Sequence, residues 1–161
     1  MKVIFLDRDG IINKERGDYT WKLEDFKFVN GLLENLLLFQ KHGFKFIVIT
    51  NQGGIARGIY SHTDVDLVHS YMREQFKKHN INLLDVFYSP YHSIISKSLS
   101  RKPDSLMFEK AIALYNVNRE QSVMIGDSER DIIAANKAGI SGVLVNSNQN
   151  LSEIKSKIIN E

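Results

Sequence analysis

Five short apolar runs, separated by longer amphipathic stretches, constrain the fold more than any other feature of this sequence. Each run has four to six residues and is rich in β-branched or aromatic side chains, which predicts strands. The runs are Val3–Leu6, Phe44–Ile49, Leu83–Tyr88, Ser122–Ile125 and Gly142–Val145. Because they are almost continuously apolar, we expect both faces of each strand to be buried, as in a parallel sheet.

The amphipathic stretches between the runs predict helices. They cover Gly31–His42, His62–His79, Asp104–Tyr115, Glu129–Ala138 and Leu151–Ile159. The first ends at Gly43, a residue suited to a helix C-terminus, and Ser61 is a suitable N-cap for the second. Strands that alternate with helices predict an α/β fold: a doubly wound, Rossmann-like parallel sheet with helices on both faces. We expect residues 1–161 to form a single domain.

Composition narrows the class of partner. The chain has 21 Lys and Arg against 19 Asp and Glu, so no charge excess indicates nucleic acid or an anionic membrane. Cysteine is absent, which excludes disulfides and thiolate metal sites. No segment approaches the ~20 apolar residues of a membrane span, and the first apolar run is too short for a secretion signal. We therefore expect a cytoplasmic protein, acting as a monomer.

In a doubly wound sheet, ligands bind beyond the carboxyl ends of the strands, so the residues after each apolar run are the candidate site. Asp7 and Asp9 follow the first run, and their spacing turns both carboxylates the same way in extended chain. The second run leads into Thr50-Asn51-Gln52-Gly53-Gly54-Ile55-Ala56-Arg57-Gly58. A hydroxyl, an amide and flexible glycines can surround a phosphate with hydrogen-bond donors.

Two further strand ends carry charge. The third run leads to Arg101-Lys102-Pro103, and the fourth to Gly126-Asp127-Ser128-Glu129-Arg130-Asp131 at the start of a helix. Each group alone has an ordinary explanation: an acidic loop, a glycine turn, solvated cations, or acids favoured by a helix dipole. Together and in order, they predict acids, a hydroxyl and an ammonium gathered at one edge of the sheet.

These residues resemble the four motifs of the haloacid dehalogenase superfamily of phosphatases. The matching segments are Phe5–Gly10, Thr50-Asn51, Lys102, and Gly126-Asp127 with Asp131. The resemblance extends from Met1 to about Val145. The first motif with Ile12-Asn13, the glycine loop after Thr50, and Arg101-Lys102-Pro103 are more specifically similar to the branch of histidinol phosphatases and heptose-bisphosphate phosphatases. Of the two groups, the heptose bisphosphate 7-phosphatases of lipopolysaccharide precursor synthesis are more similar.

The resemblance implies an Mg²⁺-dependent phosphatase that removes the 7-phosphate of D-glycero-D-manno-heptose 1,7-bisphosphate, a small sugar phosphate. Asp7 is then the nucleophile that forms an aspartyl-phosphate, and Asp9 the general acid and base. The expected Mg²⁺ ligands are the Asp7 carboxylate, the Asp9 main-chain carbonyl and the Asp127 carboxylate, with Asp131 acting through water.

The remaining motif residues are expected to bind substrate. Thr50, the backbone at Asn51 and the Lys102 ammonium should hold the transferring phosphoryl oxygens. Arg101 and Arg57 should reach the rest of the substrate, where a second phosphate would fit. Arg8 receives no role, because a residue between two acids at a strand end can point away from the site.

One departure from this branch concerns a structural zinc, which its members commonly bind through Cys-x-His and Cys-x-Cys. The matching positions here are Ser89, Tyr91, Ser98 and Ser100. Serine does not replace a thiolate as a zinc ligand, so we expect no zinc. His92 is then a surface or packing residue. The packing expected to hold this loop involves Tyr88, Tyr91, Ile94 and Ile95.

The spacing of the motifs leaves no room for a cap domain. About forty residues separate Asp7 from Thr50 and about fifty separate Thr50 from Lys102, and predicted helices and strands fill much of both intervals. The site should be open, covered at most by the loop Ile11–Asn30, in which Tyr19, Trp21 and Phe26 would form a flap.

Other functions remain open on the sequence. An open site also suits a histidinol-phosphate phosphatase or a polynucleotide 3′-phosphatase, which a substrate panel would distinguish. In a phosphoacceptor signalling domain, the acceptor aspartate ends a middle strand, whereas this acid pair follows the first strand. A catalytically inactive binding module is also possible, but all four motif positions are intact here. His62, Asp66 and His69 lie near one side of a helix, but we expect His69 to be partly buried against the core rather than to bind metal.

Overall fold

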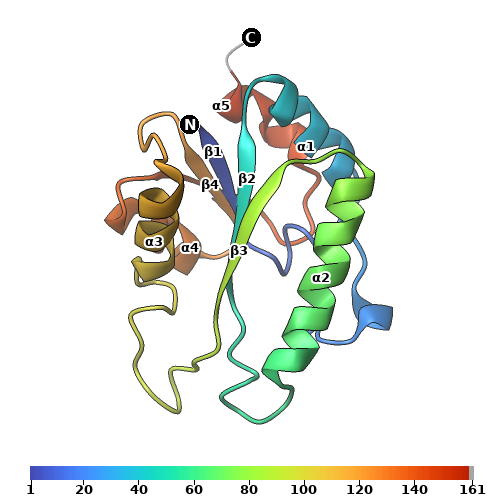
Figure 1. Ribbon diagram of the computed structural model, residues 1–161, viewed down its shortest axis with the longest axis vertical. Helices are drawn as coiled ribbons and strands as arrows, with labels where there is room; N and C mark the ends of the chain where they lie inside the picture. The colour runs from blue at the N-terminus through green and yellow to red at the C-terminus, as the bar shows by residue number, and fades with distance from the viewer. Residues whose placement is uncertain (160–161) are drawn as a thin grey trace.

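The computed structural model describes residues 1–159. Five parallel strands form one sheet in the order β3-β2-β1-β4-β5, which is the doubly wound arrangement that the sequence predicted (Figure 1). The strands are β1 (Val3–Leu6), β2 (Lys45–Asn51), β3 (Leu83–Ser89), β4 (Val123–Gly126) and β5 (Ser141–Leu144). Because the chain winds outward in both directions from β1, the strand order reverses beside the end of this central strand.

Helices cover both faces of the sheet. α1 (Leu32–Lys41) and α2 (His62–Lys78) lie on one face, and α3 (Leu106–Tyr115) and α4 (Glu129–Lys137) lie on the other (Figure 1). β1 serves both cores: Ile4 and Leu6 pack toward α1 and α2, and Val3 and Phe5 toward α3 and α4. This alternation buries every residue of β1, as its uninterrupted apolarity predicted.

α2 shows why a predicted helix forms where it does. Ser61 and Asp64 make a reciprocal capping box, which satisfies backbone donors at the helix start. Four apolar residues at helical spacing then face the core and are fully buried. They are Val65, Val68, Met72 and Phe76.

Most elements begin or end one or two residues from the predicted bounds, and two of the differences have a clear cause in the packing. β2 continues through Thr50 and Asn51, because these residues pair with Tyr88 and Ser89 of β3. The C-terminal segment, expected as one helix over Leu151–Ile159, is a 3₁₀ turn, η2 (Leu151–Ile154), followed by a single helical turn, α5 (Lys155–Ile158). The 3₁₀ turn places the buried side chains of Leu151 and Ile154 on one side.

The connection from β1 to α1 contains a short 3₁₀ helix, η1 (Leu23–Asp25), that was not predicted. The expectation that Phe26 belongs to a flap was wrong. Its ring is 3% exposed and packs edge-on against Phe28 and Tyr71 in the core. Nearer the loop tip, Tyr19 and Trp21 contact Tyr60, with ring centroids 5.6 and 6.2 Å apart.

No helix within residues 1–159 is both long enough and apolar enough to cross a membrane. No cap domain is inserted between the strands of the described chain, as predicted.

Candidate active site

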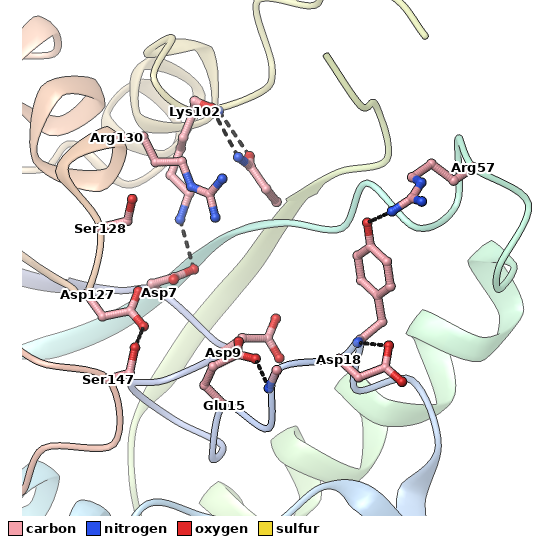
Figure 2. Close-up of a pocket in the computed structure, with 13 residues that line it drawn as sticks. Asp7, Asp9, Glu15, Asp18, Arg57, Lys102, Asp127, Ser128, Arg130 and Ser147 are labelled. Carbon is pink, nitrogen blue, oxygen red and sulfur yellow. Dashed lines mark hydrogen bonds and ion pairs between the residues drawn. The ribbon is translucent and has the colours of Figure 1, made fainter. Parts of the chain in front are cut away.

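The ammonium of Lys102 connects three segments of the chain. Its Nζ donates a hydrogen bond of 2.8 Å to Asp7 Oδ1, after β1, and another of 2.8 Å to the carbonyl of Ile49 in β2. The same Nζ lies 2.6 Å from Asp131 Oδ1 in the first turn of α4. Lys102 is 2% exposed, so these contacts form away from water (Figure 2). The predicted convergence of the strand ends is therefore present for Asp7, Lys102 and Asp131.

The charges in this cluster shift one another's pKa values. Burial raises the pKa of Asp7 to about 7, an effect that Lys102 opposes and Asp131 reinforces. Burial also acts to lower the pKa of Lys102, but the carboxylates of Asp7 and Asp131 outweigh it and raise that pKa. The two carboxylates therefore favour the charged form of Lys102, whereas burial disfavours the ionised form of Asp7.

A third carboxylate, that of Asp127, completes an acidic cluster. One oxygen each from Asp7, Asp127 and Asp131 lie within 4.8 Å of one another, close enough to hold a metal ion together. Burial raises the pKa of Asp127, and Ser147 donates a hydrogen bond to its carboxylate. A divalent cation would offset the free-energy cost of burying these carboxylates. An all-oxygen donor set suits Mg²⁺.

Gly10 permits the approach of Asp127. Its backbone has φ +88°, and a Cβ atom there would lie 2.1 Å from Asp127 Oδ2. Any side chain would therefore collide with the carboxylate and strain the backbone. Gly10, at the end of the first motif, thus leaves the space that the Asp127 carboxylate occupies.

Asp9 lies beside the cluster but is held by different groups. Its Oδ1 accepts hydrogen bonds from Arg8 Nη2 at 2.9 Å and Asn13 Nδ2 at 3.0 Å, and its Oδ2 accepts one from Gln52 Nε2 at 3.1 Å. Burial alone would raise the pKa of Asp9, but the charge of Arg8 and these hydrogen bonds lower it below its usual value. These contacts therefore favour the ionised form of Asp9.

Arg8, which the sequence left without a role, is buried and holds Asp9. Its guanidinium is also hydrogen-bonded to the carbonyl of Thr20 at 2.6 Å and to Nε2 of His69 at 3.2 Å. His69 is 5% exposed, so the expectation that it packs against the core is confirmed. Within residues 1–159, the cluster of Asp7, Asp127 and Asp131 is the one group of acids and histidines placed to hold a metal.

Thr50 and Asn51 end β2 at the same edge. The Thr50 hydroxyl is buried and accepts a hydrogen bond of 3.0 Å from Gln52 Nε2. The Asn51 side chain bridges to the backbone of Lys102, donating to its carbonyl at 3.1 Å and accepting from its N–H at 3.0 Å. Asn51 thus positions Lys102 through its side chain, a contact that the sequence did not indicate.

These groups border a cavity of about 630 Å³ that opens to solvent (Figure 2). Acidic residues form much of its wall, and basic residues stand on two sides. The lining residues are Asp7, Asp9, Glu15, Gly17, Asp18, Tyr19, Asn51, Arg57, Lys102, Asp127, Ser128, Arg130 and Ser147. Tyr19 comes from the predicted flap, which borders the site without closing it.

Comparison with known proteins identifies relatives of this chain. The family model described as HAD-hydrolase-like matches residues 99–159. The chain is 37% identical over 146 residues to the D-glycero-alpha-D-manno-heptose-1,7-bisphosphate 7-phosphatase of Photorhabdus laumondii, with 87% of this chain and 79% of that protein covered. It is 39% identical to the D-glycero-beta-D-manno-heptose-1,7-bisphosphate 7-phosphatase of Helicobacter pylori, covering 89% of this chain and 83% of the relative.

The chain belongs to the haloacid dehalogenase superfamily. Within it, the relatives place the chain in the heptose-bisphosphate phosphatase branch, and it is a phosphatase. Among solved structures, the D,D-heptose 1,7-bisphosphate phosphatase of B. bronchiseptica, complexed with magnesium and phosphate, superposes with a TM-score of 0.84 at 26% identity. The superposition covers 95% of this chain and 87% of that one.

The two arginines predicted to bind substrate are placed differently in this superfamily member. Arg57 lines the cavity, where its guanidinium donates a hydrogen bond of 3.1 Å to the hydroxyl of Tyr19. Arg101 donates to the carbonyl of Tyr91 at 2.8 Å and lines an adjoining cavity of about 570 Å³. Arg130, for which the sequence predicted no role, lines both cavities.

Hydroxyl groups occupy the loop in which this branch commonly carries zinc. Ser100 Oγ is hydrogen-bonded to Ser89 Oγ at 2.9 Å and to Ser98 Oγ at 2.8 Å. The prediction that Tyr91, Ile94 and Ile95 pack to hold this loop was wrong, because these residues are 45%, 78% and 61% exposed. A chain of hydroxyl hydrogen bonds therefore links the three serines that stand at cysteine positions.

Proposed function

We propose that this phosphatase is Mg²⁺-dependent and acts through an aspartyl-phosphate on Asp7, removing the 7-phosphate of D-glycero-D-manno-heptose 1,7-bisphosphate. The single observation that carries the proposal is the contact of Lys102 with Asp7, made beside the acidic cluster at the carboxyl edge of the sheet. It brings a nucleophile, a fixed cation and a candidate metal site together at the mouth of one cavity.

Mg²⁺ would be held by the carboxylates of Asp7 and Asp127 and by the Asp9 main-chain carbonyl, with Asp131 acting through water. When bound, it would neutralise the charge that otherwise repels a carboxylate from a phosphate. Asp131 is also paired with Lys102, so it contributes by orienting this ammonium as well.

Asp7 attacks the phosphorus, and the bond from phosphorus to the sugar oxygen breaks. Lys102 and the donors at Thr50 and Asn51 stabilise the charge on the transferring oxygens. A water then attacks the aspartyl-phosphate, which releases phosphate and restores the Asp7 carboxylate. Two successive displacements replace one difficult hydrolysis.

Asp9 donates a proton to the leaving sugar oxygen and later accepts one from the attacking water. Its contacts with Arg8, Asn13 and Gln52 favour the ionised form, which is the form needed as the base. To act as the acid, Asp9 must first be protonated, although these contacts favour its ionised form. Arg8 and Gln52 are therefore positioning residues for this carboxylate.

Substrate identity is proposed from the relatives: that of Photorhabdus laumondii is named for the alpha anomer of the heptose bisphosphate, and that of Helicobacter pylori for the beta anomer. Arg57 and Arg101 would interact with the part of the substrate beyond the reacting phosphate. We place this activity in the cytoplasm, in the synthesis of lipopolysaccharide precursors.

The test is phosphate release from a panel of esters, with and without Mg²⁺. The panel contains both anomers of the heptose bisphosphate, histidinol phosphate and an oligonucleotide with a 3′-phosphate. We expect Mg²⁺-dependent turnover that is greatest with a heptose bisphosphate. Higher kcat/KM with either of the other two substrates would replace the proposed one, and turnover unaffected by chelation would remove the metal from the mechanism.

A further inference from the structure

Three arginines at the cavities differ from the other arginines of the chain. The sequence contains seven, and four of them form ion pairs with acids: Arg8, Arg16, Arg73 and Arg119. The remaining three are Arg57, Arg101 and Arg130, which have no acidic side chain within ion-pair distance in the described part of the chain. These three line the active-site cavity or the cavity that adjoins it.

The charge of Arg130 reaches Arg101, with which it lines the adjoining cavity. Burial lowers the pKa of Arg101, and the charge of Arg130 lowers it further. The pKa of His92 is lowered by burial and then by the positive charges of Arg101, Arg57 and Arg130. Like charges held close together repel, and a bound anion would remove that repulsion.

Arg130 is also poorly placed for stability. It is the second residue of α4, where the helix dipole disfavours a cation. Its side chain is exposed and extends from the α4 side of the cavity, across from Arg57 (Figure 2). Packing and pairing within residues 1–159 therefore give no structural reason for an arginine here, whereas an anionic ligand in the cavity does.

From this placement we infer that Arg130 is a specificity-determining residue, which with Arg101 binds a second phosphate of the substrate on the α4 side of the cavity. The inference rests on the proposed function and deepens it. Lys102 and the metal that the acidic cluster would hold are proposed to engage the phosphate that is removed, whereas the arginines engage the one that stays. Arg130 lines both cavities, so it stands where a substrate would pass from one to the other.

The test compares heptose 1,7-bisphosphate with heptose 7-phosphate as substrates. In Arg130→Gln, we expect the ratio of their kcat/KM values to fall about tenfold, mainly through KM for the bisphosphate, as for loss of one charge-assisted hydrogen bond. Arg130→Lys should recover part of the ratio. Arg73→Gln, which removes the same charge at a residue that lines neither of these two cavities, should keep it.

Melting temperatures separate binding from folding. Because a cation at this end of α4 is unfavourable, Arg130→Gln should melt no lower than the wild type. An unchanged ratio would overturn the inference, and so would an equal loss with both substrates, which would place Arg130 on the reacting phosphate. If the wild type hydrolyses neither substrate, the proposed function fails first, a result distinct from a failure confined to Arg130.

Discussion

Lys102 Nζ lies 2.8 Å from Asp7 Oδ1, although the two residues are 95 positions apart in the chain. One follows the central strand and the other precedes α3, so only the parallel sheet brings them together. The contact does two things. It orients the proposed nucleophile, and it fixes a positive charge where the transferring phosphate must sit.

Replacing Asp7 with asparagine should lower kcat by several orders of magnitude, because a carboxamide does not form an aspartyl-phosphate. The fold should survive, since the amide oxygen can still accept the hydrogen bond from Lys102. Phosphate release measures the first expectation and circular dichroism the second. Near-normal turnover in a folded Asp7→Asn protein would rule out the covalent route.

Replacing Asp9 with asparagine should lower kcat by about 10²–10⁴-fold, the usual contribution of a general acid or base. Asp18→Asn is a matched control, because Asp18 lines the same cavity but hydrogen-bonds only to the neighbouring backbone of Tyr19 among residues 1–159. Equal effects of the two substitutions on kcat would mean that Asp9 contributes only charge to the cavity.

Lys102→Met should destabilise the metal-free protein by about 3–5 kcal/mol, because it leaves the buried carboxylates of Asp7 and Asp131 without their cation. The comparison is Lys137→Met, which breaks an exposed pair with Asp104 and should cost at most about 1 kcal/mol. Urea unfolding in the presence of a chelator gives both values. Similar losses in the two variants would show that the buried cluster needs no cation.

His69 should make stability depend on pH. Burial, and then Arg8, lower its pKa from 6.5 to about 3 in the folded protein. Between those pH values the unfolded chain binds the extra proton, so this contribution is fully present above pH 6.5 and is lost as the pH falls toward 3. The slope is at most about 1.4 kcal/mol per pH unit.

Unfolding of wild type and His69→Gln across this pH range isolates that contribution. Glutamine does not titrate, so the variant should lose less stability on acidification, whatever its stability at pH 7. Parallel curves for the two proteins would mean that His69 is protonated in the folded state too.

The loop from Ser89 to Ser100 should retain its shape without zinc. We expect metal analysis of protein purified without chelators to find far less than one zinc per chain, and a stoichiometric amount would refute this.

Ser100→Ala should lower the free energy of unfolding by about 1 kcal/mol, because the Ser100 hydroxyl is hydrogen-bonded to two others. Ser96→Ala, at an exposed position in the same loop, should be neutral, and an equal loss would argue against the hydroxyl chain.

Sequence periodicity was sufficient for the sheet, because buried parallel strands and amphipathic helices have local signatures. Periodicity predicted less well the strand ends and side-chain positions that depend on packing against distant segments. Thr50 and Asn51 joined β2 only because β3 lies alongside, and Phe26 turned inward because a core surface lay within reach. The apolar side chains of Ile94 and Ile95, by contrast, found no such surface and remained exposed.

The sequence by itself determined which chemical groups follow the strands, since Asp7 and Asp127 come directly after recognisable apolar runs and Lys102 lies in the loop after the third run. The tertiary structure alone decided what each group touches: the ion pairs of Lys102, the hydrogen-bond donors around Asp9, and the place of Arg130 at the cavity wall. Strand ends follow from local periodicity, whereas hydrogen bonds and charge interactions depend on distances between segments far apart in the chain.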